Sequence, residues 1–176
     1  MPAWSSSLLE VLDKRLNDNS SGKPNSSFDK DRVVNTRNVH LAVFAEPFLG
    51  FLLAGQKTVE SRFSVHRHAP FGCVRAGDIV LVKESGGPVV AIAEVSEVWY
   101  YELDANARHV IRSRFGRQLC VEPEFWESKA DSCYATLMQF ARIDRLPPIP
   151  CLKRDRRGWV VLRSSGEQRD LFSEDE

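Results

Sequence analysis

Three charged side chains within six positions, Lys57, Glu60 and Arg62, have the clearest potential for chemistry in this sequence. Charged residues are seldom buried unless they are paired, so this cluster, which follows an apolar segment, has two interpretations. The first is an edge strand with solvated charges, where an exposed ion pair contributes only about 0–1 kcal/mol. The second is a cleft in which Glu60 and Arg62 hold each other in place while Lys57 faces a polar or anionic ligand.

A short helix over residues 47–54 is predicted to precede this cluster, because the proline at its start is compatible with a first helical turn. Its apolar face carries Phe48, Phe51 and Leu52. Gly55 then suits the left-handed residue that ends many helices, a conformation that glycine adopts without strain.

The alternating pattern of residues 57–62 predicts a strand directly after this helix. Alternation directs Lys57 to one face of the strand and Glu60 and Arg62 to the other. One face of this strand is therefore polar and ionic.

The spacing G-x-K-x-x-E-x-R is accompanied by an apolar strand at 40–44, a Pro-Phe pair, a turn and strand at 70–83, and RRGWVVL at 156–162. Together these segments closely resemble the ASCH domain, a member of the PUA-like β-barrel superfamily, over about residues 38–163. The resemblance implies an α+β fold, a small PUA-like β-barrel with peripheral helices. It also implies a ligand pocket formed by Phe48, Lys57, Glu60 and Arg62, with Lys83 and Ser85 at the rim of a hairpin.

One position departs from the family pattern. Members often have Gln or Lys before the proline and Trp or Tyr after it, whereas this chain has Glu46 and Phe48. The phenyl ring lacks the hydroxyl or indole donor that the family would place in the ligand pocket.

Composition indicates one globular domain without a membrane span. The chain has 176 residues, of which 43% are hydrophobic and 27% charged, and its 24 basic residues balance 24 acidic ones. Bulk charge therefore predicts no affinity for nucleic acid. The four cysteines lie far apart without a C-x-x-C pair, so we expect no metal, no cofactor and reduced thiols in a cytoplasmic protein.

The chain divides into three predicted regions. Residues 1–37 contain a short amphipathic helix at 4–16, which either docks on the barrel or serves a partner, and a flexible linker. Residues 38–163 form the ASCH/PUA-like domain. Residues 164–176 form a disordered acidic tail, whose Gln168, Leu171 and Phe172 resemble the pentapeptide by which bacterial proteins dock on the replication sliding clamp.

Further strands are predicted at 39–44, 79–82, 89–98, 133–141 and 158–162. Helices are predicted at 105–115, ending near Gly116, and at 123–130. The proline-rich segment 146–150 is predicted to be a surface connection, since proline donates nothing to a strand ladder.

Basic residues gather locally near the end of the domain. Lys153, Arg154, Arg156 and Arg157 form a row that we expect to contact a nucleic-acid backbone, with strongly salt-dependent binding. A loop containing His66, Arg67 and His68 is either a second phosphate contact or simply solvated.

Three functions are compatible with these features. The first is a nucleic-acid-binding module that takes an RNA or modified base against Phe48. The second is a hydrolase acting on a modified nucleoside or on RNA in the same cleft, with Lys57 and Glu60 as catalytic residues. ASCH-like amidohydrolases carry a threonine where Glu60 stands here, so that catalytic set is incomplete. The third is a protein-interaction module tethered to the sliding clamp.

Overall fold

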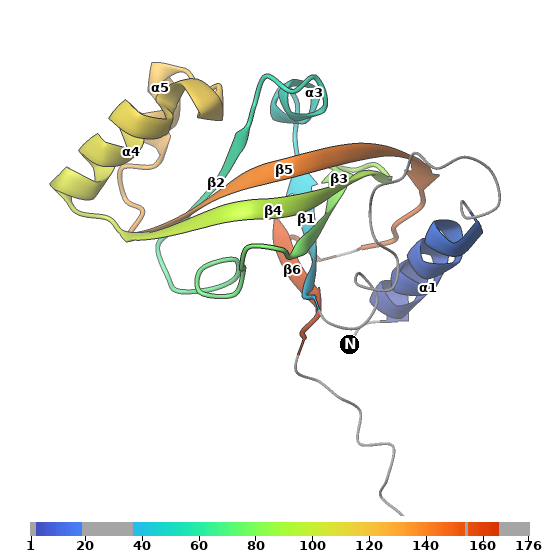
Figure 1. Ribbon diagram of the computed structural model, residues 1–176. Coiled ribbons are helices and arrows are strands. Elements are labelled where there is room, and N and C mark those ends of the chain that lie inside the picture. Colours follow the sequence, from blue (N-terminus) through green and yellow to red (C-terminus); the bar gives the residue numbers. More distant parts are fainter. Residues whose placement is uncertain (1–2, 19–36, 154, 166–176) are drawn as a thin grey trace, which may run out of the picture.

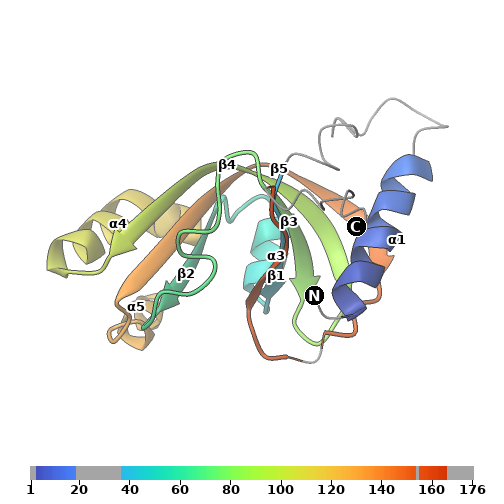
Figure 2. The same ribbon diagram turned by 90° about the horizontal axis from the view of Figure 1, so that it is seen from below.

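The computed structural model describes residues 3–18, 37–153 and 155–165 (Figure 1). Six strands form one mixed sheet in the order β2-β5-β4-β3-β1-β6. The sheet is strongly curled, and Figure 2 shows it as an arch whose long strands β4 and β5 span the top. The strands are β1 (Val39–Phe44), β2 (Val59–Ser64), β3 (Ile79–Glu84), β4 (Val89–Glu102), β5 (Tyr134–Ile149) and β6 (Trp159–Arg163).

The curled sheet confirms the predicted α+β class and takes the form of a half-barrel. Its two edge strands, β2 and β6, form no ladder with each other among the described residues. A seam therefore remains between them. We use the word seam below for this gap, which is bordered by β2 on one side and by β6 and the end of β1 on the other.

The central strands are apolar on both faces because each face has its own core. Leu41 and Leu81 belong to one cluster, which the N-terminal helix α1 (Ala3–Asp18) covers with Leu8. Val80 and Val82 belong to the cluster on the opposite face, together with two residues of α3. Burial on both faces explains why residues 79–82 read as a continuous apolar run.

Helix α3 (Phe48–Leu53) is shorter than predicted and turns a different face inward. Its buried residues are Leu49 and Leu52, whereas Phe48 and Phe51 are only half-buried. The prediction was therefore correct for Leu52, but Leu49 takes the inward position that was predicted for the two phenylalanines. Gly55 has the positive φ of 73° that the sequence predicted for the end of this helix.

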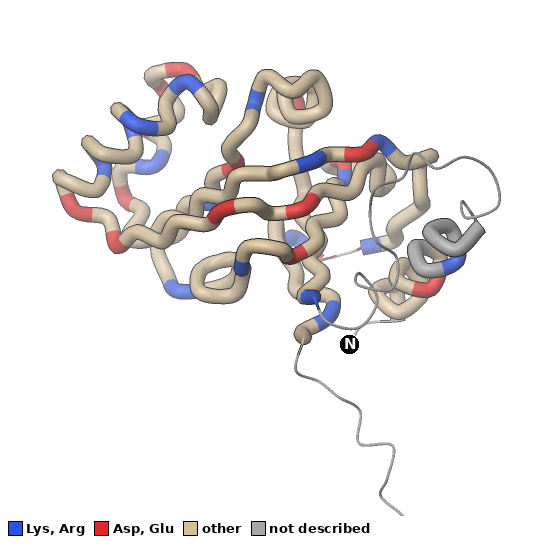
Figure 3. The backbone as a smooth tube through the Cα atoms, in the orientation of Figure 1, with Lys and Arg blue, Asp and Glu red and all other residues tan. Residues whose placement is uncertain are grey.

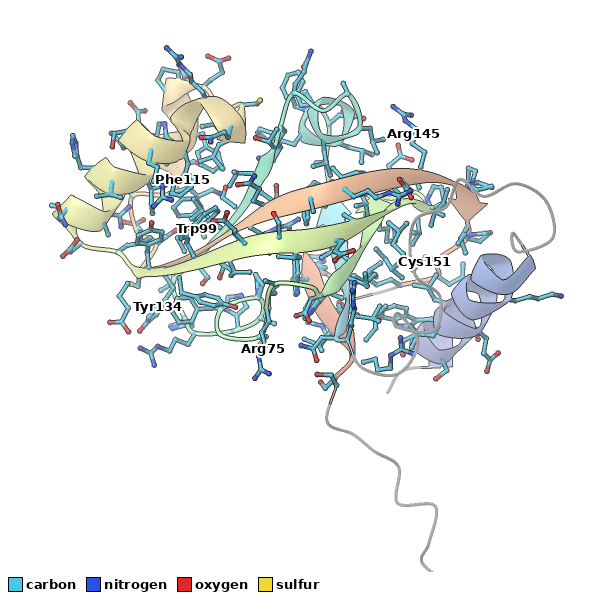
Figure 4. The ribbon with its side chains drawn as sticks, in the orientation of Figure 1. Arg75, Trp99, Phe115, Tyr134, Arg145 and Cys151 are labelled. Carbon is cyan, nitrogen blue, oxygen red and sulfur yellow. The ribbon has the colours of Figure 1, made fainter. Side chains whose placement is uncertain are left out.

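Helix α4 (Ala105–Leu119) does not end near Gly116, as predicted, but continues for almost another turn to Cys120, whose φ is 53°. It begins at Asp104, which accepts a hydrogen bond from the Ala107 N–H. The extension buries Leu119 completely, and this burial outweighs the low helix propensity of glycine. Figure 4 shows Trp99 of β4 against Phe115 of α4, with ring centroids 4.7 Å apart.

Strand β5 continues through the segment that was predicted to be a surface connection. It pairs with β4 at Arg145 and Ile149, and the register shifts between these pairs. Pro147 and Pro148 are exposed and lie in this shifted stretch, where β5 has a neighbour on one side only, since β2 pairs with residues 134–139. The missing N–H groups therefore cost no ladder bond.

The remaining elements agree with the sequence. The short helix α5 (Pro123–Ser128) follows α4, and the β3–β4 hairpin turns at Gly86 with φ 75°. No helix in the described part of the chain is long and apolar enough to cross a membrane. The clamp-like residues Gln168, Leu171 and Phe172 lie outside the described residues, as does the predicted linker from 19 to 36.

A buried polar network centred on Asp78 joins β1, β3 and β6. Asp78 Oδ2 accepts hydrogen bonds from Asn38 Nδ2 at 3.0 Å, His40 Nε2 at 3.1 Å and the Arg75 N–H at 2.8 Å. Trp159 Nε1 lies 3.3 Å from His40 Nδ1. Because an indole N–H only donates, Nδ1 is the acceptor, and the proton of the neutral imidazole faces Asp78.

This network predicts a specific loss of stability in acid. Burial raises the pKa of the Asp78 carboxyl, but hydrogen bonds from His40, Asn38 and the Arg75 backbone together lower it below its ordinary value. Since the unfolded pKa is about 3.9, the ionised carboxyl contributes stability above about pH 4 and loses it as pH falls through the folded pKa. Asp78→Asn should be less stable by about 2 kcal/mol at pH 7, and this difference should shrink by pH 3.

Urea denaturation at both pH values measures the effect. The exposed Asp131, changed to Asn, is the matched control and should show no pH-dependent difference. An Asp78→Asn deficit of equal size at pH 7 and pH 3 would contradict the assignment of this carboxylate.

Candidate functional site

Glu60 is the centre of a buried ion cluster at the start of β2. Its Oε2 atom lies 3.3 Å from Lys57 Nζ, and its Oε1 atom lies 2.8 Å from Arg62 Nε. Glu60 is 5% exposed and Lys57 is 3% exposed. The Arg62 contact is an ion pair and not a hydrogen bond, because the Nε–H does not point at the carboxylate.

The position of Lys57 corrects the predicted alternation. The strand begins at Val59, so Lys57 belongs to the turn after α3, where its N–H donates to Phe51 O at 3.1 Å. Strand periodicity therefore does not apply to it, and its side chain reaches the same side as Glu60. The three ionic side chains meet in one place.

Lys57 is fixed by a third contact at the end of α4. Its Nζ donates to Leu119 O at 2.9 Å and lies 5.4 Å from the centroid of the Phe48 ring. The last carbonyl groups of a helix lack intrahelical donors, and the helix dipole favours a cation there. Lys57 thus ties α4 to the start of β2.

Arg62 spans the seam of the half-barrel. Its Nη2 donates to Val43 O of β1 at 2.9 Å, and its Nη1 donates to Gly158 O, directly before β6, at 3.3 Å. The guanidinium also lies 5.1 Å from the Phe44 ring centroid and 5.6 Å from that of Trp159. A planar fork with several donors can make these contacts together, whereas a lysine ammonium cannot replace it.

A pocket of about 320 Å³ opens beside this ion cluster. We call it the triad pocket. Figure 1 shows β2 rising between α3 and the α4–α5 pair, and residues from all three regions border the pocket. Its volume falls at the lower end of the range of about 300–1,000 Å³ that small-molecule sites occupy. The residues used below are Phe48, Lys57, Glu60, Ser61, Phe125 and Lys129.

Aromatic rings form much of the wall of the triad pocket. The Phe125 ring stands edge-on to Phe48, with centroids 6.5 Å apart, and to Phe63, at 5.6 Å. Lys129 Nζ lies 5.4 Å from the Phe125 centroid. The pocket therefore combines apolar ring surfaces with one carboxylate and two ammonium groups.

Sequence reasoning missed the contributions of Phe125 and Lys129 from α5 and its C-cap. The aromatic pair Phe125-Trp126 after a proline was a visible signal of a packed turn. Its position opposite β2 depends on how α4 folds back on the sheet, which the local pattern does not specify.

Lys83 and Ser85 do not border the triad pocket, where the resemblance had put them. They border a second hollow of about 350 Å³, which we call the basic hollow. The β3–β4 hairpin opens toward the segment before β6, so its rim faces that segment and not α3. Val43 borders both hollows.

The basic row lies at this second hollow. Lys153, Arg156 and Arg157 border it together with Lys83, against one carboxylate, Asp155. Lys153 Nζ lies 2.7 Å and Arg157 Nε 3.1 Å from Asp155 Oδ1, and hydrogen bonds from Arg157 and Lys153 lower the pKa of Asp155.

The remaining members of the row differ from each other. Arg156 is exposed and has no hydrogen bond or ion pair with any described residue. Arg154 lies outside the described residues. Elsewhere, basic and acidic residues are interspersed over the molecule (Figure 3).

Comparison with solved structures decides the fold. The structure aligns with the ASCH crystal structure from Zymomonas mobilis at a TM-score of 0.57 and 14% identity, covering 71% of this chain and 87% of that one. This chain has the ASCH fold. Two further structures of that protein, one with a tyrosine-to-phenylalanine and one with a serine-to-alanine substitution, give TM-scores of 0.59 at 15% and 14% identity. They cover 73% and 75% of this chain and 93% of their own.

The structural match confirms the resemblance that the sequence motifs indicated. No protein-family model matches the ASCH-like chain, and a search of curated proteins gives no match either. The similarity therefore concerns the fold of this module.

The ion cluster predicts a large stability effect at one position. Glu60→Gln leaves Lys57 and Arg62 next to a neutral amide, so two largely buried cations lose their counter-charge. Breaking a buried ion pair by removing one partner typically costs about 3–5 kcal/mol. We expect a loss of this size in the free energy of unfolding, measured by urea denaturation.

Glu97→Gln is the matched control, since Glu97 is exposed on β4. It should change stability by less than about 0.5 kcal/mol. If both variants were equally stable, the carboxylate of Glu60 would not hold the cluster together.

Proposed function

We propose that this ASCH module binds single-stranded RNA by taking one unstacked base into the triad pocket. The observation that carries this proposal is the combination of phenyl rings with a buried carboxylate–ammonium pair around one cavity. Sequence-specific RNA recognition mostly uses unstacked bases that stack on aromatic side chains and form hydrogen bonds along their edges.

The ion cluster retains capacity for a ligand. An ammonium group has three N–H donors, and Lys57 donates one of them to Leu119 O while it forms an ion pair with Glu60. A carboxylate has about four acceptor sites, and Glu60 engages two cations. Donor and acceptor capacity therefore remains for the polar edge of a base, while Arg62, turned toward Val43 and Gly158, keeps the wall in position.

The basic hollow supplies the partner for phosphate. It adjoins the triad pocket at Val43, and Arg156 has no protein partner among the described residues. A strand with one base in the triad pocket would bring its backbone within reach of these cations. This arrangement joins the two predicted sets, the ligand residues and the basic row, in one binding surface.

The contacts of Lys57 favour binding over hydrolysis. A catalytic lysine works as a base or nucleophile through the lone pair of its amine, whereas Lys57 Nζ donates to a carbonyl and lies beside a carboxylate, so both contacts hold it in a structural role. Incubation with acetylated cytidine and with RNA tests this point. If the wild type formed product and Lys57→Ala did not, the function would be hydrolysis and not binding.

Stacking on Phe48 gives the first test of RNA binding. Phe48→Ala should weaken binding of a fluorescein-labelled RNA octanucleotide by about 5- to 150-fold, because stacking contributes about 1–3 kcal/mol per base. Fluorescence anisotropy measures the affinity. Val11→Ala removes an exposed apolar side chain from α1 and should bind like the wild type. Equal affinities for all three proteins would sink the proposal.

Salt dependence gives the second test. If Arg156 contacts one phosphate, Arg156→Ala should reduce the slope of log affinity against log salt concentration by about 0.7, the value for one contact to a single strand. Arg75→Ala is the matched control, because the residue is exposed and only its backbone forms hydrogen bonds with Asp78. An unchanged slope in Arg156→Ala would remove Arg156 from the interface.

A further inference from the structure

A third hollow, of about 470 Å³, lies on the other side of Arg62 from the triad pocket. We call it the seam pocket. Arg62 and Phe63 border both pockets, and Arg157 borders the seam pocket as well as the basic hollow. The three hollows thus adjoin one another along the gap that Arg62 bridges. The function proposed above uses only two of them.

Thr136 provides a buried polar group in the seam pocket. It pairs with Arg62 of β2 in the ladder and is 1% exposed. The residue also borders the pocket. A threonine hydroxyl can both donate and accept hydrogen bonds, so it can contact a ligand that enters.

His68 offers a second polar group at the same pocket. Its Nδ1 lies 2.8 Å from His66 O. A carbonyl only accepts, so Nδ1 carries the proton and Nε2 of the neutral ring is an acceptor. Phe71 also borders the pocket, and its ring is held edge-on by Tyr100 and Tyr134, with centroids 5.2 and 5.0 Å away.

We propose that the seam pocket binds a second nucleotide of the same strand, so that the recognised unit is a dinucleotide whose two bases are separated by Arg62. The proposal rests on RNA binding at the triad pocket. Aromatic surface at Phe71, hydrogen-bonding groups on Thr136 and His68, and a cation at Arg157 are the contacts that an unstacked nucleotide requires. Asp155 holds Arg157 in place at the junction with the basic hollow.

The test compares an RNA dinucleotide with the same dinucleotide made abasic at one position or the other. Backbone charge is then equal in all three ligands. Competition against a labelled octanucleotide measures their affinities. For the wild type, removal of either base should weaken binding at least about fivefold, since each base has its own pocket.

Two tryptophan variants assign each base to a pocket. Ser64→Trp fills the seam pocket and Ser61→Trp fills the triad pocket, because each serine borders one of them. In each variant, the affinity should no longer depend on the base whose pocket is filled. The base concerned should differ between the two variants. Thr136→Val keeps the side-chain shape, removes the hydroxyl and should weaken the intact dinucleotide about 3- to 10-fold without lowering thermal stability.

The outcomes separate this inference from the function on which it rests. If the octanucleotide itself does not bind, the proposed function is wrong. If binding depends on one base only, and neither Ser64→Trp nor Thr136→Val changes it, the triad pocket remains the site and the second nucleotide is excluded. Should Ser64→Trp fail to fold, Thr136→Val and the abasic ligands decide.

Discussion

The structure depends on one buried carboxylate, that of Glu60. A buried charge must be paired, and Glu60 has two partners that lead to different parts of the chain. Lys57 connects it to the end of α4 at Leu119, and Arg62 connects it to Val43 and Gly158. The Glu60 side chain therefore links the position of helices α4 and α5 to the closure of the half-barrel.

Closure by a side chain has a consequence that closure by a strand ladder would not have. Paired strands lie about 4.8 Å apart and leave no space between their backbones. A guanidinium forms two hydrogen bonds to carbonyl groups of the opposite edge, and hollows remain beside it in the seam. The same residue thus stabilises the fold and separates two candidate subsites. Arginine is suited to this position because its donors are fixed in one plane.

Local sequence predicted most of the fold, since strands such as β1 and β3 have patterns that only a covered sheet explains. It failed where a tertiary contact decided the outcome. Burial of Leu119 carries α4 past Gly116, and a one-sided stretch of β5 tolerates Pro147. The ionic residues of the site were identifiable from their types and spacing. Strand alternation alone put Lys57 on the wrong face, because β2 begins only at Val59. Phe125 was missed because it reaches the pocket through the path of a helix.

Charge explains how a neutral chain can present a binding surface for a polyanion. Basic and acidic residues alternate over most of the molecule, so no long-range field attracts nucleic acid. At the basic hollow, Asp155 is kept ionised by Arg157 and Lys153, which lower its pKa, and in return it orients both. The positive charge left for a ligand comes mainly from Arg156, because the buried Lys83 Nζ donates to Glu84 O and Gly87 O. Few phosphate contacts are then available, and affinity must depend on the bases that enter the pockets, which favours selective over general binding.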